Sequence, residues 1–289
     1  MLSESQLQHA IELIVQSDAI IIAAGAGMGV DSGLPDFRGN AGFWNAYPAL
    51  GTRNIPFHEI ASPAAFRRRA QEAWGFYGHR LALYRRTVPH VGFQILLEWA
   101  KAKPAGYSVF TSNVDGQFQL AGFDPQRLNE CHGSIHQLQC MLPCGDAIWS
   151  AHQFHPLVDE IHCQLKNAAP RCPRCDGMAR PNILMFDDWD WLDHYQQAQA
   201  ARQTHWLDTV SRPLVIEIGA GTAIPTVRHF SQRIVRQYGG RLLRINLRES
   251  QVASQHDLGL AAGAVEALTA IEQALNGYLS TKSLNEIAQ

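Results

Sequence analysis

The run Ala19-Ile20-Ile21-Ile22-Ala23-Ala24, which leads directly into Gly25-Ala26-Gly27, decides the fold. A short, continuous and partly β-branched apolar run is typical of a strand that is buried on both faces of a parallel sheet. Similar runs recur at 107–111, 214–218 and 242–246, and the stretches between them are long enough for helical crossovers. This alternation predicts an α/β fold with a parallel sheet.

Composition excludes several classes of protein. The chain has 289 residues, of which 46% are hydrophobic and 17% charged, and 24 basic side chains face 26 acidic ones for a net charge of -2. Disorder requires low hydrophobicity and high net charge, and binding to a nucleic-acid backbone requires an excess of Lys and Arg. The longest apolar stretch, 19–30, is broken by glycines and is too short to span a bilayer, and the N-terminal flank lacks the positive start of a secretory signal. We therefore expect a soluble, cytoplasmic protein with no nucleic-acid or membrane partner.

Four of the six cysteines form two close pairs, Cys140 with Cys144 and Cys172 with Cys175. Two such pairs can supply the four soft ligands of a tetrahedral zinc site. Four cysteine ligands leave no open position for water, so the metal would be structural. The alternatives are cysteines that are simply buried, or a ligand set in which Cys163 replaces one of the four.

Two glycine-rich segments follow predicted strands. Gly25-Ala26-Gly27 follows the first strand, and Gly219-Ala220-Gly221-Thr222 follows the run 214–218. Ligands of open α/β sheets bind at the carboxyl ends of the strands, where glycine allows the backbone to approach a phosphate. We expect both segments to face one nucleotide, although Val30 stands where the dinucleotide fingerprint has its third glycine; a glycine-rich turn without a ligand is the alternative.

A third strand end carries polar side chains. Asn113 and Asp115 follow the run 107–111, and His132 comes seventeen residues after Asp115. Histidine titrates near neutral pH and is a suitable general base at such a site. A structural histidine with satisfied hydrogen bonds is the alternative.

Together these residues resemble the Sir2 family of NAD-dependent deacylases, the sirtuins. The resemblance covers Gly25–Gly27 with Ser32–Gly39, the Asn113 and Asp115 pair, His132-Gly133, the four cysteines, Arg180–Phe186 and Ile245–Leu247. It implies a Rossmann-like NAD-binding domain made of residues 1–41, 90–138 and 182–289. A smaller domain would comprise a helical insert at 42–89 and a zinc insert at 139–181.

The resemblance also implies a reaction, in which the acyl group of an acylated lysine on a protein or peptide is transferred to NAD, with release of nicotinamide and O-acyl-ADP-ribose. His132 would be the catalytic base, while Asn113 and Asp115 would hold the ribose and the nicotinamide pocket. Leu184 and Phe186 would line the acyl-lysine tunnel. Residues expected to bind NAD are Gly25, Ala26, Gly27, Asp36, Phe37, Arg38, Ser112, Asn113, Asp115, Gly219, Gly221, Thr222 and Asn246.

A further match concerns the acyl group. Ala61, Tyr77 and Arg80 resemble the desuccinylase branch of the family, and Tyr77 and Arg80 share a helix face at i and i+3. An arginine and a tyrosine hydroxyl can bind a carboxylate, and a small alanine leaves room for it. We expect activity on succinyl-, malonyl- or glutaryl-lysine as well as acetyl-lysine. The alternative is that Tyr77 packs in the core and Arg80 is solvated.

The chain departs from the sirtuin pattern at several positions: Gly29, Ser112, Phe118, Asp187, Asp188 and Ala223. Ser112 stands where the family has a longer glutamine near the ribose, and this difference bears on how the reaction intermediate is handled. Two alternatives to deacylation therefore stay open. One is an ADP-ribosyltransferase or NAD hydrolase, and the other is a non-catalytic module that senses NAD.

Overall fold

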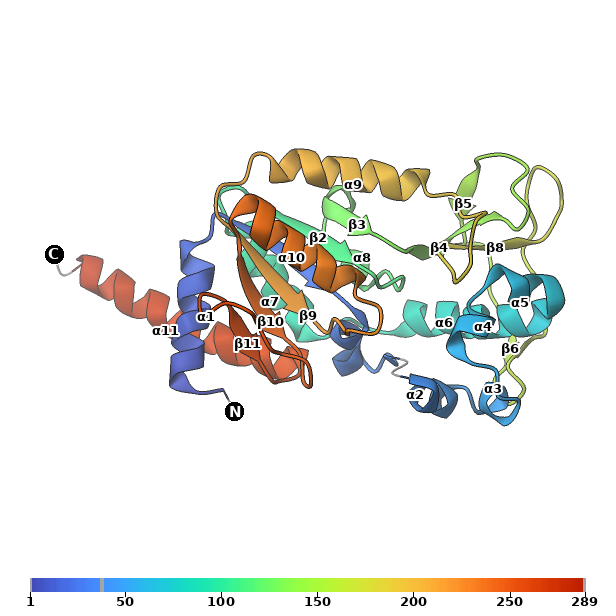
Figure 1. Cartoon of the computed structure of the whole chain (residues 1–289), viewed down its shortest axis with the longest axis horizontal. Helices are drawn as coiled ribbons and strands as arrows, with labels where there is room; N and C mark the ends of the chain where they lie inside the picture. Colours follow the sequence, from blue (N-terminus) through green and yellow to red (C-terminus); the bar gives the residue numbers. More distant parts are fainter. Residues whose placement is uncertain (1, 37–38, 288–289) are drawn as a thin grey trace.

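A six-stranded parallel sheet forms the centre of the larger part of the molecule (Figure 1). The computed structural model describes residues 2–36 and 39–287. The strand order is β11-β10-β9-β1-β2-β3, and every neighbouring pair runs parallel. The strands are β1 (Ala19–Ala24), β2 (Tyr107–Thr111), β3 (Leu128–Glu130), β9 (Pro213–Ile218), β10 (Arg241–Ile245) and β11 (Leu258–Leu260).

Strand β1 lies in the middle of this sheet because its residues can be buried on both faces. All six side chains of Ala19–Ala24 are completely buried, and Ile22 lies opposite Val109 of β2 and Ile216 of β9. The predicted strand at 107–111 is confirmed at both ends, and those at 214–218 and 242–246 are confirmed to within one residue.

Helices cover both faces of the sheet (Figure 1). Apolar residues of α1 (Glu4–Gln16), α7 (Val91–Lys101) and α11 (Ala264–Ile287) pack on one face, while α9 (His194–Leu207) and α10 (Thr226–Tyr238) contribute to the core on the other. Among the helices of residues 2–36 and 39–287, none is both long and apolar enough to cross a membrane.

A second group of elements has its own hydrophobic core and lies beyond one end of the sheet (Figure 1). Its helices are α2 (Gly39–Ala46), α3 (Pro48–Thr52), α4 (Phe57–Ile60), α5 (Pro63–Arg68) and α6 (Ala70–Arg86). Its antiparallel strands are β4 (Gly133–Cys140), β5 (Ile148–Ser150), β6 (Val158–Asp159), β7 (Gln164–Leu165) and β8 (Ala179–Ile183). Short turns of helix complete the fold: η1 (Ala26–Ser32), α8 (Gln117–Leu120) and η2 (Pro125–Arg127).

The predicted fold class, a parallel-sheet domain with a smaller helical and cysteine-rich insert, is therefore confirmed. The domain boundaries remain a prediction. The segment Arg180–Phe186, which carries part of the resemblance, is strand only as far as Ile183, where β8 ends, and Leu184–Phe186 lies beyond it.

Candidate active site

The carboxyl ends of β1, β2, β3 and β9 open into one cavity of about 680 Å³. It brings together most of the side chains that the sequence predicted. The predicted residues that line it are Gly25, Ala26, Gly27, Asp36, Ala61, Tyr77, Arg80, Ser112, Asn113, Asp115, His132, Leu184, Phe186, Gly219, Gly221 and Thr222. Phe37 and Arg38 lie outside the described residues.

The two glycine segments cross backbone to backbone. The amide of Gly27 donates to the carbonyl of Gly219 at 3.0 Å, and a Cβ atom added to Gly25 would lie 2.7 Å from that same carbonyl oxygen. Gly219 itself has a φ of +63°, which L side chains rarely adopt. A side chain at any of these positions would force the two loops apart. Both segments line the cavity, where backbone without bulky side chains suits the close approach of a dinucleotide pyrophosphate.

Asn113 and Asp115 are fixed by the backbone around them. The side-chain nitrogen Nδ2 of Asn113 donates to the backbone carbonyl of Gly25 at 3.0 Å, and this hydrogen bond joins the end of β2 to the end of β1. Asp115 is buried, and its Oδ1 accepts from the backbone amide of Gln117 at 2.9 Å. Burial raises the pKa of Asp115 to about 6, although that hydrogen bond and the charge of Arg80 oppose the shift.

His132 follows β3 by two residues and is half-buried at the cavity wall. Burial lowers its pKa below the usual value, while a hydrogen bond with the backbone of Ser112 acts in the opposite direction. The imidazole is therefore mostly neutral at pH 7, which is the form that can accept a proton. Its own carbonyl accepts from the Leu184 amide at 2.9 Å, so the histidine and the predicted tunnel segment are tied together.

Another part of the cavity lining comes from α6 and the segment after β8. Tyr77 and Arg80 on α6 line the cavity together with Ala61 and Phe186, and the Phe186 amide donates to the Ala61 carbonyl at 3.0 Å. Arg80 is only 8% exposed. The alternative in which Arg80 is solvated is therefore wrong, although Tyr77 does pack against Phe66 in the core.

Asn246, expected to contact the cofactor, does not appear among the described residues that line the cavity. It is buried, its amide donates to the Ala220 carbonyl at 2.9 Å, and its Oδ1 accepts from two backbone amides of the following turn. Arg248 and Glu249 reach the cavity instead. They lie three and four residues after the end of β10, and charged side chains so close to a strand end are a signal that the sequence offered. Tyr84, one helical turn after Arg80, also lines the cavity and was not predicted.

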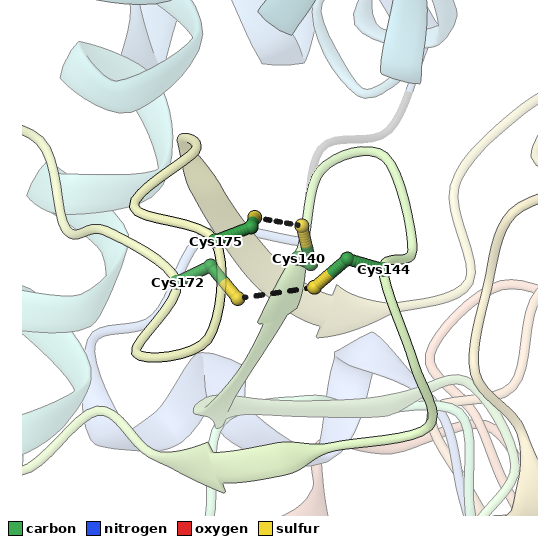
Figure 2. A group of neighbouring side chains, drawn as sticks. All are labelled: Cys140, Cys144, Cys172 and Cys175. Carbon is green, nitrogen blue, oxygen red and sulfur yellow. Dashed lines mark hydrogen bonds between the residues drawn. The ribbon is translucent and has the colours of Figure 1, made fainter.

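Figure 2 shows the four predicted zinc ligands facing one another. None of the four is among the residues that line the cavity. The sulfur atoms of Cys140, Cys144, Cys172 and Cys175 lie within 4.8 Å of one another, and the Cys140–Cys175 and Cys144–Cys172 pairs are each 3.6 Å apart. Tetrahedral zinc with bonds of about 2.3 Å places its sulfur ligands about 3.8 Å apart, so the cluster fits a structural zinc ion. Cys163 is buried outside the cluster, and the ligand swap is wrong.

The model of the Sir2 family matches residues 25–216 of this chain. The match spans the glycine segment, the Asn113 and Asp115 pair, His132 and all four clustered cysteines. The chain belongs to the Sir2 family.

Curated relatives are similar over nearly their whole length. The chain is 28% identical to NAD-dependent protein deacylase 2 of Pyrobaculum aerophilum, over 94% of this chain and 96% of that protein. It is 29% identical to the NAD-dependent protein deacylase of Pyrococcus furiosus, over 89% and 93% of the two chains. A solved Sir2 homologue in complex with NAD has the same fold, with a TM-score of 0.69 at 22% identity over 94% of each chain.

Proposed function

We propose that this chain, an NAD-dependent protein deacylase of the Sir2 family, removes acidic acyl groups such as succinyl, malonyl or glutaryl from lysine side chains as well as acetyl. Its partners would be acylated lysines on proteins or peptides. Support for the deacylase activity comes from the family match and from the relatives, which are named NAD-dependent protein deacylases. Support for the acidic acyl group comes from the cavity itself.

NAD is a substrate of this reaction, and it supplies a nicotinamide leaving group and a ribose that accepts the acyl group. The glycine segments Gly25–Gly27 and Gly219–Gly221 would lie against its pyrophosphate, and the Asn113 and Asp115 pair would hold the nicotinamide ribose. His132, neutral at pH 7, would take a proton from a ribose hydroxyl. The aromatic and aliphatic side chains of Phe186 and Leu184 would exclude water from the acyl-lysine.

One observation carries the acyl preference. The guanidinium of Arg80 is buried in the wall of the cavity, beside Tyr77 and on the same wall as the small side chain of Ala61. A carboxylate meets a guanidinium with paired, charge-assisted hydrogen bonds, and these are stronger where water is excluded. A short acyl chain that ends in a carboxylate would gain this interaction, whereas an acetyl group would not.

The test compares wild type with Arg80→Met on two peptides that differ only in carrying succinyl- or acetyl-lysine. We expect the kcat/KM of the variant for the succinyl peptide to fall by at least about a hundredfold, because a buried charged pair is lost. The value for the acetyl peptide should change by less than about threefold. Equal loss on both peptides, or succinyl activity that survives unchanged, would contradict the acyl preference.

A further inference from the structure

Two glycines allow the backbone of helix α6 to pack closely against a neighbouring segment. A Cβ atom on Gly75 would lie 2.2 Å from the carbonyl oxygen of Cys163, and one on Gly78 would lie 2.8 Å from the Pro156 side chain. The helix backbone therefore packs directly against the segment 156–163. At about 100° per residue, the face opposite the two glycines carries Tyr77, Arg80 and Tyr84 within about 60° of one another. All three line the cavity.

Within this face, Tyr84 has a specific contact with Arg80. The Nε of Arg80 donates to the hydroxyl oxygen of Tyr84 at 2.9 Å, and both side chains are buried. The guanidinium carbon also lies 5.1 Å from the ring centre of Phe76, 5.6 Å from that of Tyr77 and 5.4 Å from that of Tyr84. Three rings thus surround the cation, and the Tyr84 hydroxyl makes a directional hydrogen bond with its Nε edge.

We propose that Tyr84 is a positioning residue for the acyl-carboxylate site: its hydroxyl holds the Nε edge of the Arg80 guanidinium, so that the terminal nitrogens are presented to the acyl carboxylate. This inference rests on the proposed action on acidic acyl groups. A guanidinium binds a carboxylate best in the plane of its fork, so its orientation decides the strength of the pair. The carboxylate site then consists of three residues on one face of α6, which are Tyr77, Arg80 and Tyr84.

The decisive variant is Tyr84→Phe, which keeps the ring and removes only the hydroxyl. We expect its kcat/KM for a succinyl-lysine peptide to fall about tenfold, mainly through a higher KM, because one hydrogen bond to a charged group is lost. Its kcat/KM for the acetyl-lysine peptide should stay within about twofold of wild type. In an Arg80→Met background, Tyr84→Phe should have no further effect on the ratio of the two values, because it acts through Arg80.

Tyr107→Phe is the matched control. Its hydroxyl accepts from the Asp124 amide at 3.1 Å and its ring lies 5.0 Å from the Arg127 guanidinium carbon, so it is another tyrosine beside an arginine but is not among the cavity residues. It should leave the acyl ratio unchanged. Three results would overturn the role of Tyr84: an unchanged ratio in Tyr84→Phe, an equal loss on both peptides, or a persistent effect in the Arg80→Met background. A wild-type protein inactive on succinyl-lysine would overturn both this inference and the proposed acyl preference.

Discussion

Arg180 and Asp188 form a bidentate ion pair inside the protein. Nη1 and Nη2 of Arg180 donate to Oδ2 and Oδ1 of Asp188 at 2.7 and 2.8 Å, and both side chains are completely buried. Asp188 also accepts from the backbone amide of Met185 at 3.3 Å. This pair therefore ties the segment Leu184–Phe186, which lines the cavity, to strand β8. The departure from the sirtuin pattern at Asp188 has a structural reason.

Replacing one member of the pair should be costly. Asp188→Asn leaves the Arg180 charge buried without its counter-charge, and we expect a loss of about 3–5 kcal/mol in the free energy of unfolding measured in urea. Asp176→Asn is the control, because the Arg171–Asp176 pair has side chains that are 65% and 85% exposed and should contribute about 0–1 kcal/mol. A loss below 1 kcal/mol in Asp188→Asn would show that water or a rearranged loop compensates the arginine.

Glu130 predicts a pH-dependent change in stability. Burial raises its pKa from 4.5 to about 7, with hydrogen bonds from Gln119, Gln199 and Ser134 acting against the shift. The folded state holds this proton more tightly than the unfolded state, so the contribution of Glu130 to stability falls as pH rises from about 4.5 to 7. Glu130→Gln should therefore stabilise the protein by about 1–3 kcal/mol at pH 8 and have little effect at pH 4.5.

Urea unfolding of wild type and variant at pH 4.5, 6, 7 and 8 measures this difference. Glu12→Gln, at an exposed position of α1, should show no comparable trend with pH. A Glu130→Gln effect that is the same at every pH would mean that the carboxyl titrates normally.

The pKa of His132 should determine where kcat/KM falls as the pH is lowered. Burial lowers its pKa, and the general base must be neutral. The fall of kcat/KM at low pH should therefore have its midpoint below pH 6.5. Asp115, with a pKa of about 6, also titrates in this range. The same fall should therefore persist in Asp115→Asn if His132 causes it. His132→Ala should reduce deacylation by at least about a hundredfold while NAD still binds. A midpoint above pH 6.5, or a variant with near-normal turnover, would remove His132 from the role of base.

The cysteine cluster predicts one zinc ion per chain. Cys144→Ser should lose most of the metal and lower the unfolding temperature, because folding of the insert is coupled to zinc binding. Elemental analysis of the purified protein measures the metal directly. Cys163→Ala, outside the cluster, should retain one equivalent. Wild-type protein that is free of zinc after purification without chelators, or Cys144→Ser with a full equivalent, would be incompatible with the assignment.

Much of the fold could be predicted because it depends on local patterns. The run Ala19–Ala24 predicts a central strand from its own residues alone, because all six are apolar. The glycines after it predict a close approach of another backbone segment or a ligand. The contacts of Asn246 could not be predicted, because whether it faces the cavity or holds the Ala220 loop depends on how two loops pack. The roles of Tyr84 and Asp188 depend on partners that the fold brings close to them. Arg80 lies one helical turn from Tyr84, and Arg180 lies across a loop from Asp188.

The most direct measurement of the central claim is product stoichiometry. The protein is incubated with NAD and a succinyl-lysine peptide, and nicotinamide, free lysine peptide and the acylated ADP-ribose are quantified by mass spectrometry. A deacylase of this kind yields the three products in equal amounts, and nicotinamide release stops when the peptide is omitted. Nicotinamide release that continues without peptide, or ADP-ribose attached to protein, would instead identify an NAD hydrolase or an ADP-ribosyltransferase and contradict the proposed function.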